Sequence, residues 1–259
     1  MSADSPNGRA SAGGPRGDLL VLCYHAVSED WPAVLSISQG ELERQLSRLA
    51  RRGYRGVPAR EALADPGAGR VVAITFDDAY RSVLELAKPV LDRLGMRASV
   101  YVPTDWPDRD APMAWDGIDR WLGGPHEHEL ACLGWDELRG LADAGWEVGS
   151  HTRSHPRLSQ VGDDARLADE LEGSRLVCEE RLGRPCESIA YPYGDWDERV
   201  VEAAGRAGYA FGLTLGRLHE PQPLAWPRVG VYRPDAPWRF RLKVSPAVRR
   251  VRSLTARWA

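Results

Sequence analysis

Residues 71–78 read VVAITFDD, an apolar, β-favouring run that ends in two adjacent aspartates, Asp77 and Asp78. A short apolar run without helical period is typical of a strand that is buried on both faces of a parallel sheet. Two carboxylates directly after such a strand are costly unless a cation lies beside them. The stretch therefore predicts a buried parallel strand with a charged site at its end, where the aspartates can also cap a following helix.

Short apolar runs alternate with amphipathic segments on both sides of this stretch. Further strands are expected over 19–25, 98–103, 146–150, 188–191, 211–214 and 228–232. Helices are expected from the capping-box pair Ser38 and Glu41 onward, and over 83–94, 135–144, 163–182 and 197–207. Strands alternating with helices predict a mostly parallel sheet. We expect a single-domain α/β fold, a distorted (β/α) barrel of about seven strands.

The composition limits the classes of protein to consider. The chain has 259 residues, 43% of them hydrophobic and 27% charged, and a formal net charge of -3, which argues against a general nucleic-acid binder. It contains neither the ~20 apolar residues of a membrane span nor the ~7–15 of a secretory signal. We therefore expect a cytoplasmic protein with a disordered leader (1–18), a folded domain (19–237) and a basic C-terminal tail (238–259).

The polar residues that stand out share one topological position, the point where a predicted strand ends and its loop begins. In a parallel barrel these ends emerge on one face, where active sites are built. The residues in this position are His25, Asp77, Asp78, His151, His155 and Tyr193.

The segment HTRSH places His151 and His155 four residues apart, directly after a predicted strand. Such a pair on its own is more often two surface histidines, but here another strand end offers two carboxylates. Neutral imidazoles with one carboxylate suit Zn²⁺, Co²⁺ or Ni²⁺ and leave positions open for water. The second carboxylate could stay ionised nearby and accept a proton from water that the metal activates.

The motifs TFDD (75–78), HTRSH (151–155) and YPYG (191–194) together resemble those of the polysaccharide deacetylase family. This family is also known as the NodB homology domain or carbohydrate esterase family 4. YHAV (24–27) and PRVGVY (227–232), with the phrase GYRGV, resemble a subgroup that carries a YH strand ahead of TFDD. The resemblance spans about residues 19–232. It implies a distorted barrel that hydrolyses the acetyl group of an N-acetylated sugar with one divalent metal ion.

The resemblance also implies a role for each motif residue. Asp77 matches the catalytic base, and Tyr193 matches the residue whose backbone N–H helps to hold the oxyanion. The metal ligands would be Asp78, His151 and His155, with zinc the expected ion and cobalt or nickel as alternatives.

The general acid has two candidates. In the YH subgroup it comes from the N-terminal strand, which points to His25, whereas many other members use a histidine near the C-terminus. The only C-terminal candidate is His219, in the polar stretch GRLHEPQP, where nothing local is expected to hold its ring. We prefer His25, because it ends a buried strand on the rim that carries the other site residues.

Two positions depart from the family pattern. Ala79 stands where the family usually has glycine, a mild change unless a positive φ is needed there. Ala190 stands where the family often has an arginine that orients the base. The base must then be oriented by another residue, and Arg228 is our candidate.

Other functions and partners stay open at this point. The alternatives are a sugar O-deacetylase, an inactive carbohydrate-binding module on the same fold, and another metal hydrolase such as a phosphoesterase. The substrate could be a polymer, a lipid-linked glycan or a small molecule. The basic tail is read as a solvated helix, with contact to anionic lipid or a lipid-linked sugar as the sharper alternative. The sequence does not indicate an oligomeric state.

Overall fold

One parallel sheet runs through the computed structural model, which describes residues 17–66, 69–216 and 219–249. Its order is β10-β9-β8-β7-β6-β5-β1-β11, and a further strand, β4, pairs with β5. The strands are β1 (Asp18–Tyr24), β4 (Arg55–Val57), β5 (Arg70–Phe76), β6 (Ser99–Val102), β7 (Glu147–Ser150), β8 (Ser188–Ala190), β9 (Phe211–Thr214), β10 (Trp226–Pro227) and β11 (Val229–Gly230). A separate pair, β2 (Ala26–Val27) and β3 (Ser36–Ile37), lies beside the barrel.

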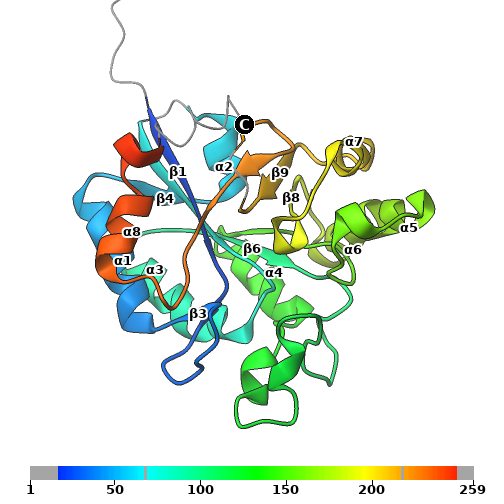
Figure 1. Cartoon of the computed structure of the whole chain (residues 1–259), viewed down its shortest axis with the longest axis horizontal. Helices are drawn as coiled ribbons and strands as arrows, with labels where there is room; N and C mark the ends of the chain where they lie inside the picture. Colours follow the sequence, from blue (N-terminus) through cyan, green and yellow to red (C-terminus); the bar gives the residue numbers. More distant parts are fainter. Residues whose placement is uncertain (1–16, 67–68, 217–218, 250–259) are drawn as a thin grey trace, which may run out of the picture.

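One extended segment, residues 226–230, connects the two edges of this sheet. Its first half, β10, pairs with β9, and its second half, β11, pairs with β1, so that Arg228 lies at the seam. The Arg228 N–H donates to the Thr214 carbonyl at 3.2 Å. The sheet thus forms a nearly closed, barrel-like shape, and the predicted distorted α/β barrel is confirmed (Figure 1).

The helices cover the outside of the barrel and one of its ends. They are α1 (Gln39–Arg51), α2 (Ala59–Ala64), α3 (Lys88–Arg93), α4 (Trp135–Asp143), α5 (Asp164–Ala168), α6 (Ser174–Leu182), α7 (Glu198–Arg206) and α8 (Pro237–Lys243). A π-helical turn, Val83–Ala87, leads into α3, and another, Asp169–Gly173, joins α5 to α6. Figure 1 shows α1, α3 and α8 on one side of the strands and α5, α6 and α7 on the other.

The first long helix begins where the sequence predicts. The Ser38 side chain accepts a hydrogen bond from the Glu41 N–H at 3.2 Å and caps α1. The apolar face of α1 is buried through Leu42, Leu46 and Leu49. The strand β4 and the helix α2 were not expected, because segments of three and six residues are too short to show a recognisable period.

Side chains fill the inside of the barrel, and alternation along each strand decides which they are. Along β5 and its end, Val71, Ala73, Thr75 and Asp77 share one parity, so the run that packs the interior also delivers the aspartate. At the amino-terminal end, the buried carboxylate of Glu147 accepts hydrogen bonds from Ser99 and Ser188 side chains at 2.5 and 2.6 Å and from the first turn of α2. The barrel is therefore a packed core and not a pore.

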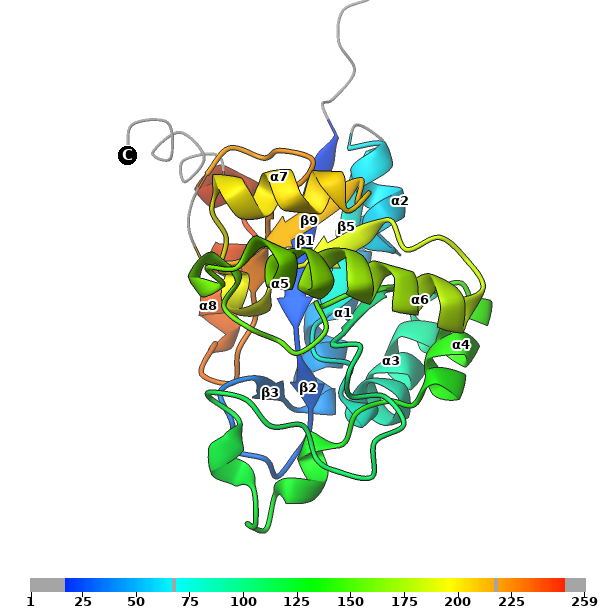
Figure 2. The same cartoon turned by 90° about the vertical axis from the view of Figure 1, so that its right-hand side faces the viewer.

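The carboxyl ends of the strands face the long irregular segment between β6 and α4. Figure 2 shows this segment (green) with β2 and β3 at one end of the molecule, below β1. Two 3₁₀ turns, Asp119–Trp121 and Glu127–Leu130, are its regular parts. The segment covers the rim on which the sequence places the site.

The two ends of the chain differ in how far the structure describes them. The predicted leader falls largely on residues 1–16 and the end of the basic tail on 250–259, both outside the described residues. Phe240 and Val244 are buried, and Arg249 pairs with Asp18 at the start of β1. Within the described ranges, no helix is long and apolar enough to cross a membrane.

Gly149 of β7 tests the packing inside the barrel. A Cβ added there would lie 2.4 Å from a ring carbon of Tyr101 and 2.8 Å from Ser188 Oγ, so we expect Gly149→Ala to destabilise the fold by about 1–3 kcal/mol through overpacking. Gly140→Ala is the matched control, because nothing lies within 4 Å of its added Cβ on the exposed side of α4. That control should gain about 0.5–1 kcal/mol from helix propensity. Urea unfolding measures both, and equal stability of the two variants would contradict the packing described here.

Candidate active site

A pocket of about 420 Å³ opens at the carboxyl ends of the strands. Four different strands deliver its polar lining: β1, β5, β7 and β8. Every catalytic and metal-binding residue predicted from the sequence lines it, namely His25, Asp77, Asp78, His151, His155 and Tyr193. Arg228 is buried behind this lining, against Asp77.

Asp78, His151 and His155 form one buried cluster. Asp78 Oδ1 lies 3.3 Å from Nε2 of each histidine, and the potential ligand atoms of the three residues all lie within 4.8 Å of one another. His151 Nδ1 lies 2.7 Å from the carbonyl oxygen of Ala190. Since a carbonyl only accepts, Nδ1 carries the proton and the Nε2 lone pair is directed at the cluster.

The cluster suits a divalent metal ion. Within the described residues, neither Asp78 Oδ1 nor His155 Nδ1 has a hydrogen-bond partner, although both are buried. Burial would raise the pKa of Asp78, but the imidazoles of His151 and His155 beside it hold it well below its ordinary value. Burial lowers the pKa of His155, which favours the neutral form that can bind a metal. One carboxylate and two imidazoles are a common donor set for zinc.

A second group of potential ligands, Cys23, His25 and Asp77, also lies within 4.8 Å. Cys23 was not predicted as a site residue, although it lies two residues before His25 and so shares its side of the strand. Its thiol donates to Asp77 Oδ2 at 3.3 Å, and burial raises its pKa well above the usual range. Because Asp77 is already paired with the Arg228 cation, a metal fits the Asp78 cluster better.

Asp77 and Arg228 form a bidentate ion pair inside the barrel. Arg228 Nη1 lies 2.6 Å from Asp77 Oδ1 and Nη2 lies 2.7 Å from Oδ2, with the arginine side chain 0% exposed. Arg228 also donates to Thr75 Oγ1 at 3.0 Å and to the Thr214 carbonyl at 3.3 Å. Burial would raise the pKa of Asp77, but Arg228 lowers it to about 2. The carboxylate is therefore ionised at neutral pH and fixed in orientation.

The two candidate acids occupy different places. His25 lines the pocket, and burial lowers its pKa although Asp78 and Asp77 oppose this. His219 is outside the pocket lining: its Nε2 lies 2.7 Å from Thr214 Oγ1 and its Nδ1 2.9 Å from the Glu220 carbonyl. The expectation that nothing local holds His219 is therefore wrong, since these bonds and the Trp196 ring at 4.8 Å fix it.

Left-handed backbone is concentrated at this rim. The residues with positive φ here are Asp78 (68°), Ala79 (53°), Thr152 (65°), His155 (65°) and Tyr193 (60°). Non-glycine residues adopt this conformation at a cost of about 1–2 kcal/mol each, and such strain is typical of functional sites. The substitution of alanine at position 79 is thus not mild, because the position requires the φ that glycine adopts freely.

Aromatic rings hold one of the histidines in place. Trp115 stacks on His155 with ring centroids 4.2 Å apart, and Tyr193 meets the same ring at 4.7 Å. The Tyr193 hydroxyl donates to the Asp116 carbonyl at 3.0 Å, which ties the YPYG turn to the irregular segment. The loop between β2 and β3 also reaches the pocket through Val34 and Leu35, which no motif in the sequence predicted.

Comparison with known proteins agrees with this geometry. A family model described as polysaccharide deacetylase matches residues 64–212. Poly-beta-1,6-N-acetyl-D-glucosamine N-deacetylase of Staphylococcus aureus is 24% identical over 192 residues, which are 70% of this chain and 61% of that protein. The chain thus spans less than two thirds of that relative.

Solved structures share the fold. IcaB from Ammonifex degensii is 25% identical with a TM-score of 0.70, over 92% of this chain and 98% of that chain. The Streptococcus pyogenes deacetylase PplD, solved in complex with acetate, is 21% identical with a TM-score of 0.71, over 90% of this chain and 100% of that chain. On the family match, which covers more than half of the sequence, this chain belongs to the polysaccharide deacetylase family.

Proposed function

We propose that this protein is a metal-dependent hydrolase that removes the acetyl group from an N-acetylated sugar and releases acetate and a free amine. The observation that carries the proposal is the pairing of two buried groups in one pocket. One is the Asp78–His151–His155 cluster, and the other is the ionised Asp77 that Arg228 holds beside it.

Asp78, His151 and His155 would hold the metal ion, with zinc the best fit and cobalt or nickel as alternatives. When bound, such an ion polarises a carbonyl and lowers the pKa of water. The Ala190 carbonyl orients His151, and stacking against Trp115 orients His155, so that the chain presents these ligands in a fixed arrangement.

Asp77 would act as the general base. It is ionised at neutral pH, and both of its oxygens accept hydrogen bonds from Arg228, which leaves lone pairs on the pocket side. It takes a proton from the water that attacks the acetyl carbonyl. Arg228 positions this carboxylate in place of the arginine that the family often carries at position 190.

Two further residues would complete the reaction. The Tyr193 backbone N–H donates to the carbonyl oxygen as negative charge develops on it, an interaction that is typically worth about 3 kcal/mol. His25, protonated, gives a proton to the nitrogen as the carbon–nitrogen bond breaks, because an amine leaves poorly as an anion. Burial lowers the pKa of His25, which makes the imidazolium a stronger acid but leaves a smaller fraction of it protonated at neutral pH.

The relatives and the pocket support this substrate class. The matched Staphylococcus aureus protein is named for N-deacetylation of poly-β-1,6-N-acetyl-D-glucosamine. A pocket of about 420 Å³ beside Trp115 and Tyr232 suits a sugar ring, because aromatic faces pack against the apolar faces of sugars. Acetate release from N-acetylglucosamine oligomers, compared with an O-acetylated sugar, tests the proposal directly.

The metal assignment predicts the effect of removing one ligand. Purified protein should carry about one divalent ion per chain, and His151→Ala should lose it, because two ligands bind a metal far more weakly than three. His128→Ala is the control, since its side chain is 71% exposed on the irregular segment. Elemental analysis of the folded proteins decides the point, and full metal content in His151→Ala would refute the assignment.

If Asp77 is the base and not a metal ligand, its substitution should lower turnover without removing the metal. Asp77→Asn should keep the metal but lower kcat at least about 100-fold, because an amide cannot accept the proton. Thermal unfolding should accompany the assay, since the change leaves the Arg228 charge buried without its partner. If a folded Asp77→Asn variant has lost its metal as well, the aspartates share the ligand role.

The acid assignment predicts a dependence on the leaving group. His25→Ala should cut turnover of an N-acetyl substrate at least about 100-fold, and should cost less on an activated aryl acetate, whose leaving group needs no proton. His219→Ala should stay close to the unmodified protein on both substrates, because its ring bonds to Thr214 and Glu220 away from the pocket lining. The reverse ranking on the N-acetyl substrate would assign the acid to His219.

A further inference from the structure

The helix α8 is apolar on two opposite faces. Phe240 and Val244 point inward and are only 2% and 1% exposed. Trp238 and Leu242, one helical turn apart on the other side, are 57% and 50% exposed. A surface helix normally keeps its outward face polar, and an apolar outer face calls for a partner. Within the described residues, nothing covers this face.

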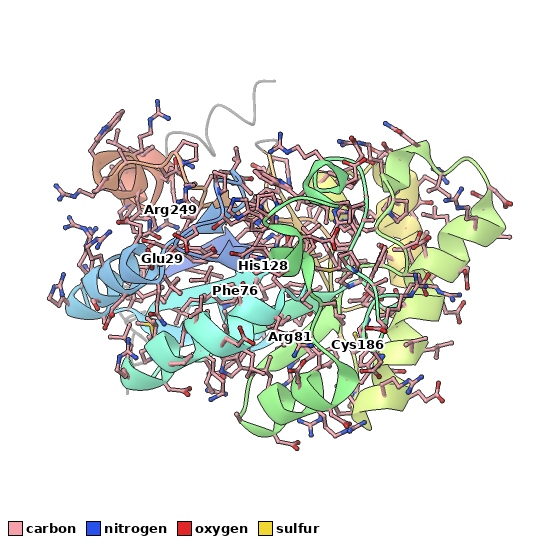
Figure 3. All side chains as sticks on the ribbon, turned by 90° about the horizontal axis from the view of Figure 1, so that it is seen from below. Glu29, Phe76, Arg81, His128, Cys186 and Arg249 are labelled. Atoms are coloured by element: carbon pink, nitrogen blue, oxygen red, sulfur yellow. The ribbon has the colours of Figure 1, made fainter. Side chains whose placement is uncertain are left out.

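A cationic groove runs between this helix and α1. It has a volume of about 510 Å³, and four arginines line it: Arg44, Arg48 and Arg51 of α1 and Arg241 of α8. Figure 1 shows the two helices side by side at one edge of the barrel, and in Figure 3 nitrogen-tipped side chains project outward from that edge.

Most of this charge is not neutralised within the fold. Two glutamates also line the groove: Glu41 pairs with Arg44, and Glu43 pairs with Arg93, which lies outside it. Across residues 17–66, 69–216 and 219–249, Arg48, Arg51 and Arg241 form no ion pair. The Nε of Arg48 is buried and has no hydrogen-bond partner there.

We propose that the groove between α1 and α8 and the apolar face of α8 together dock the protein on an anionic phospholipid surface. The lipid phosphates lie against Arg48, Arg51 and Arg241, and Trp238 and Leu242 enter the interfacial layer.

The Arg239 guanidinium lies 5.5 Å from the centre of the Trp238 ring. It therefore stays beside the aromatic side chain that enters the interface.

The apolar face favours a lipid surface over a free anion. A soluble phosphate would need the arginines alone and would leave Trp238 and Leu242 without a role. Tryptophan is enriched at membrane interfaces, where its ring packs among acyl chains while its N–H stays among the polar headgroups. Arginines beside such residues bind the phosphates of anionic lipids.

The docking surface is distinct from the candidate active site. None of the groove residues lines the pocket that contains Asp77 and Asp78. The inference therefore goes beyond the proposed function and can fail or hold independently of it. His151→Ala, which should lose the metal, should still bind to vesicles.

The test uses the full chain and sedimentation with vesicles. Phosphatidylcholine vesicles with about 30 mol% phosphatidylglycerol should bind the protein, and pure phosphatidylcholine vesicles should not. The triple variant Arg48→Ala/Arg51→Ala/Arg241→Ala should bind about 100-fold more weakly, at about five-fold for each arginine. Raising the salt concentration should weaken binding of the unmodified protein, because exposed charges are screened.

Matched variants separate the docking surface from general charge and hydrophobicity. Arg166→Ala/Arg184→Ala/Arg206→Ala removes the same charge from exposed positions on the α5–α7 side and should bind like the unmodified protein. Leu242→Ala should weaken binding, whereas Leu176→Ala, at the same 50% exposure, should not. Unchanged thermal unfolding midpoints confirm that each variant is folded.

Two results would overturn the proposal. One is equal binding of the groove triple and the matched triple to the anionic vesicles. The other is saturable binding of inorganic phosphate by the unmodified protein without any sedimentation on those vesicles, which would make the groove a site for a soluble anion.

Discussion

The ion pair between Asp77 and Arg228 is the interaction on which the rest of the site depends. Removing two charges from water costs several kcal/mol for each ion, and only good geometry with further hydrogen bonds offsets that cost. Here the contacts are bidentate, and Thr75 and the Thr214 carbonyl accept from the same guanidinium. Because Arg228 lies between β10 and β11, the residue that orients Asp77 also lies at the seam of the barrel. The same residue therefore lies where the barrel closes and orients the carboxylate.

The left-handed residues at the rim show where the fold accepts local strain. Asp78, Ala79 and His155 have positive φ, and none is a glycine. A regular strand continuing past Phe76 would point successive side chains to opposite faces, so Asp77 and Asp78 could not both face one pocket. The turn at Asp78 changes that alternation and brings its carboxylate to the two histidines while Asp77 stays with Arg228. The strain is thus the means by which adjacent aspartates reach different partners.

The sequence predicted those parts of the structure that leave a periodic or motif signal. The capped helix from Ser38 and the strand ending at Phe76 are long enough for their pattern to be recognised. The short strand β4 and the six-residue α2 carry no such pattern, although α2 fills one end of the barrel. Strand ends predicted which residues gather at the rim, but no sequence rule gives the backbone φ of Ala79 or the bonds that hold His219. Those depend on tertiary contacts that only the folded chain supplies.

Composition alone also hides how charge is distributed. The net charge of -3 describes the average of the chain, whereas the groove between α1 and α8 gathers unpaired arginines from positions about 190 residues apart in sequence. The cations that follow Trp238 do not act alike: Lys243 pairs with Asp235 and Arg249 with Asp18, so both stabilise the fold. Arg241 instead joins the arginines of α1. The basic run in the sequence therefore contains some cations that form ion pairs within the fold and others that stay unpaired. Packing against a distant helix determines which residue belongs to which group.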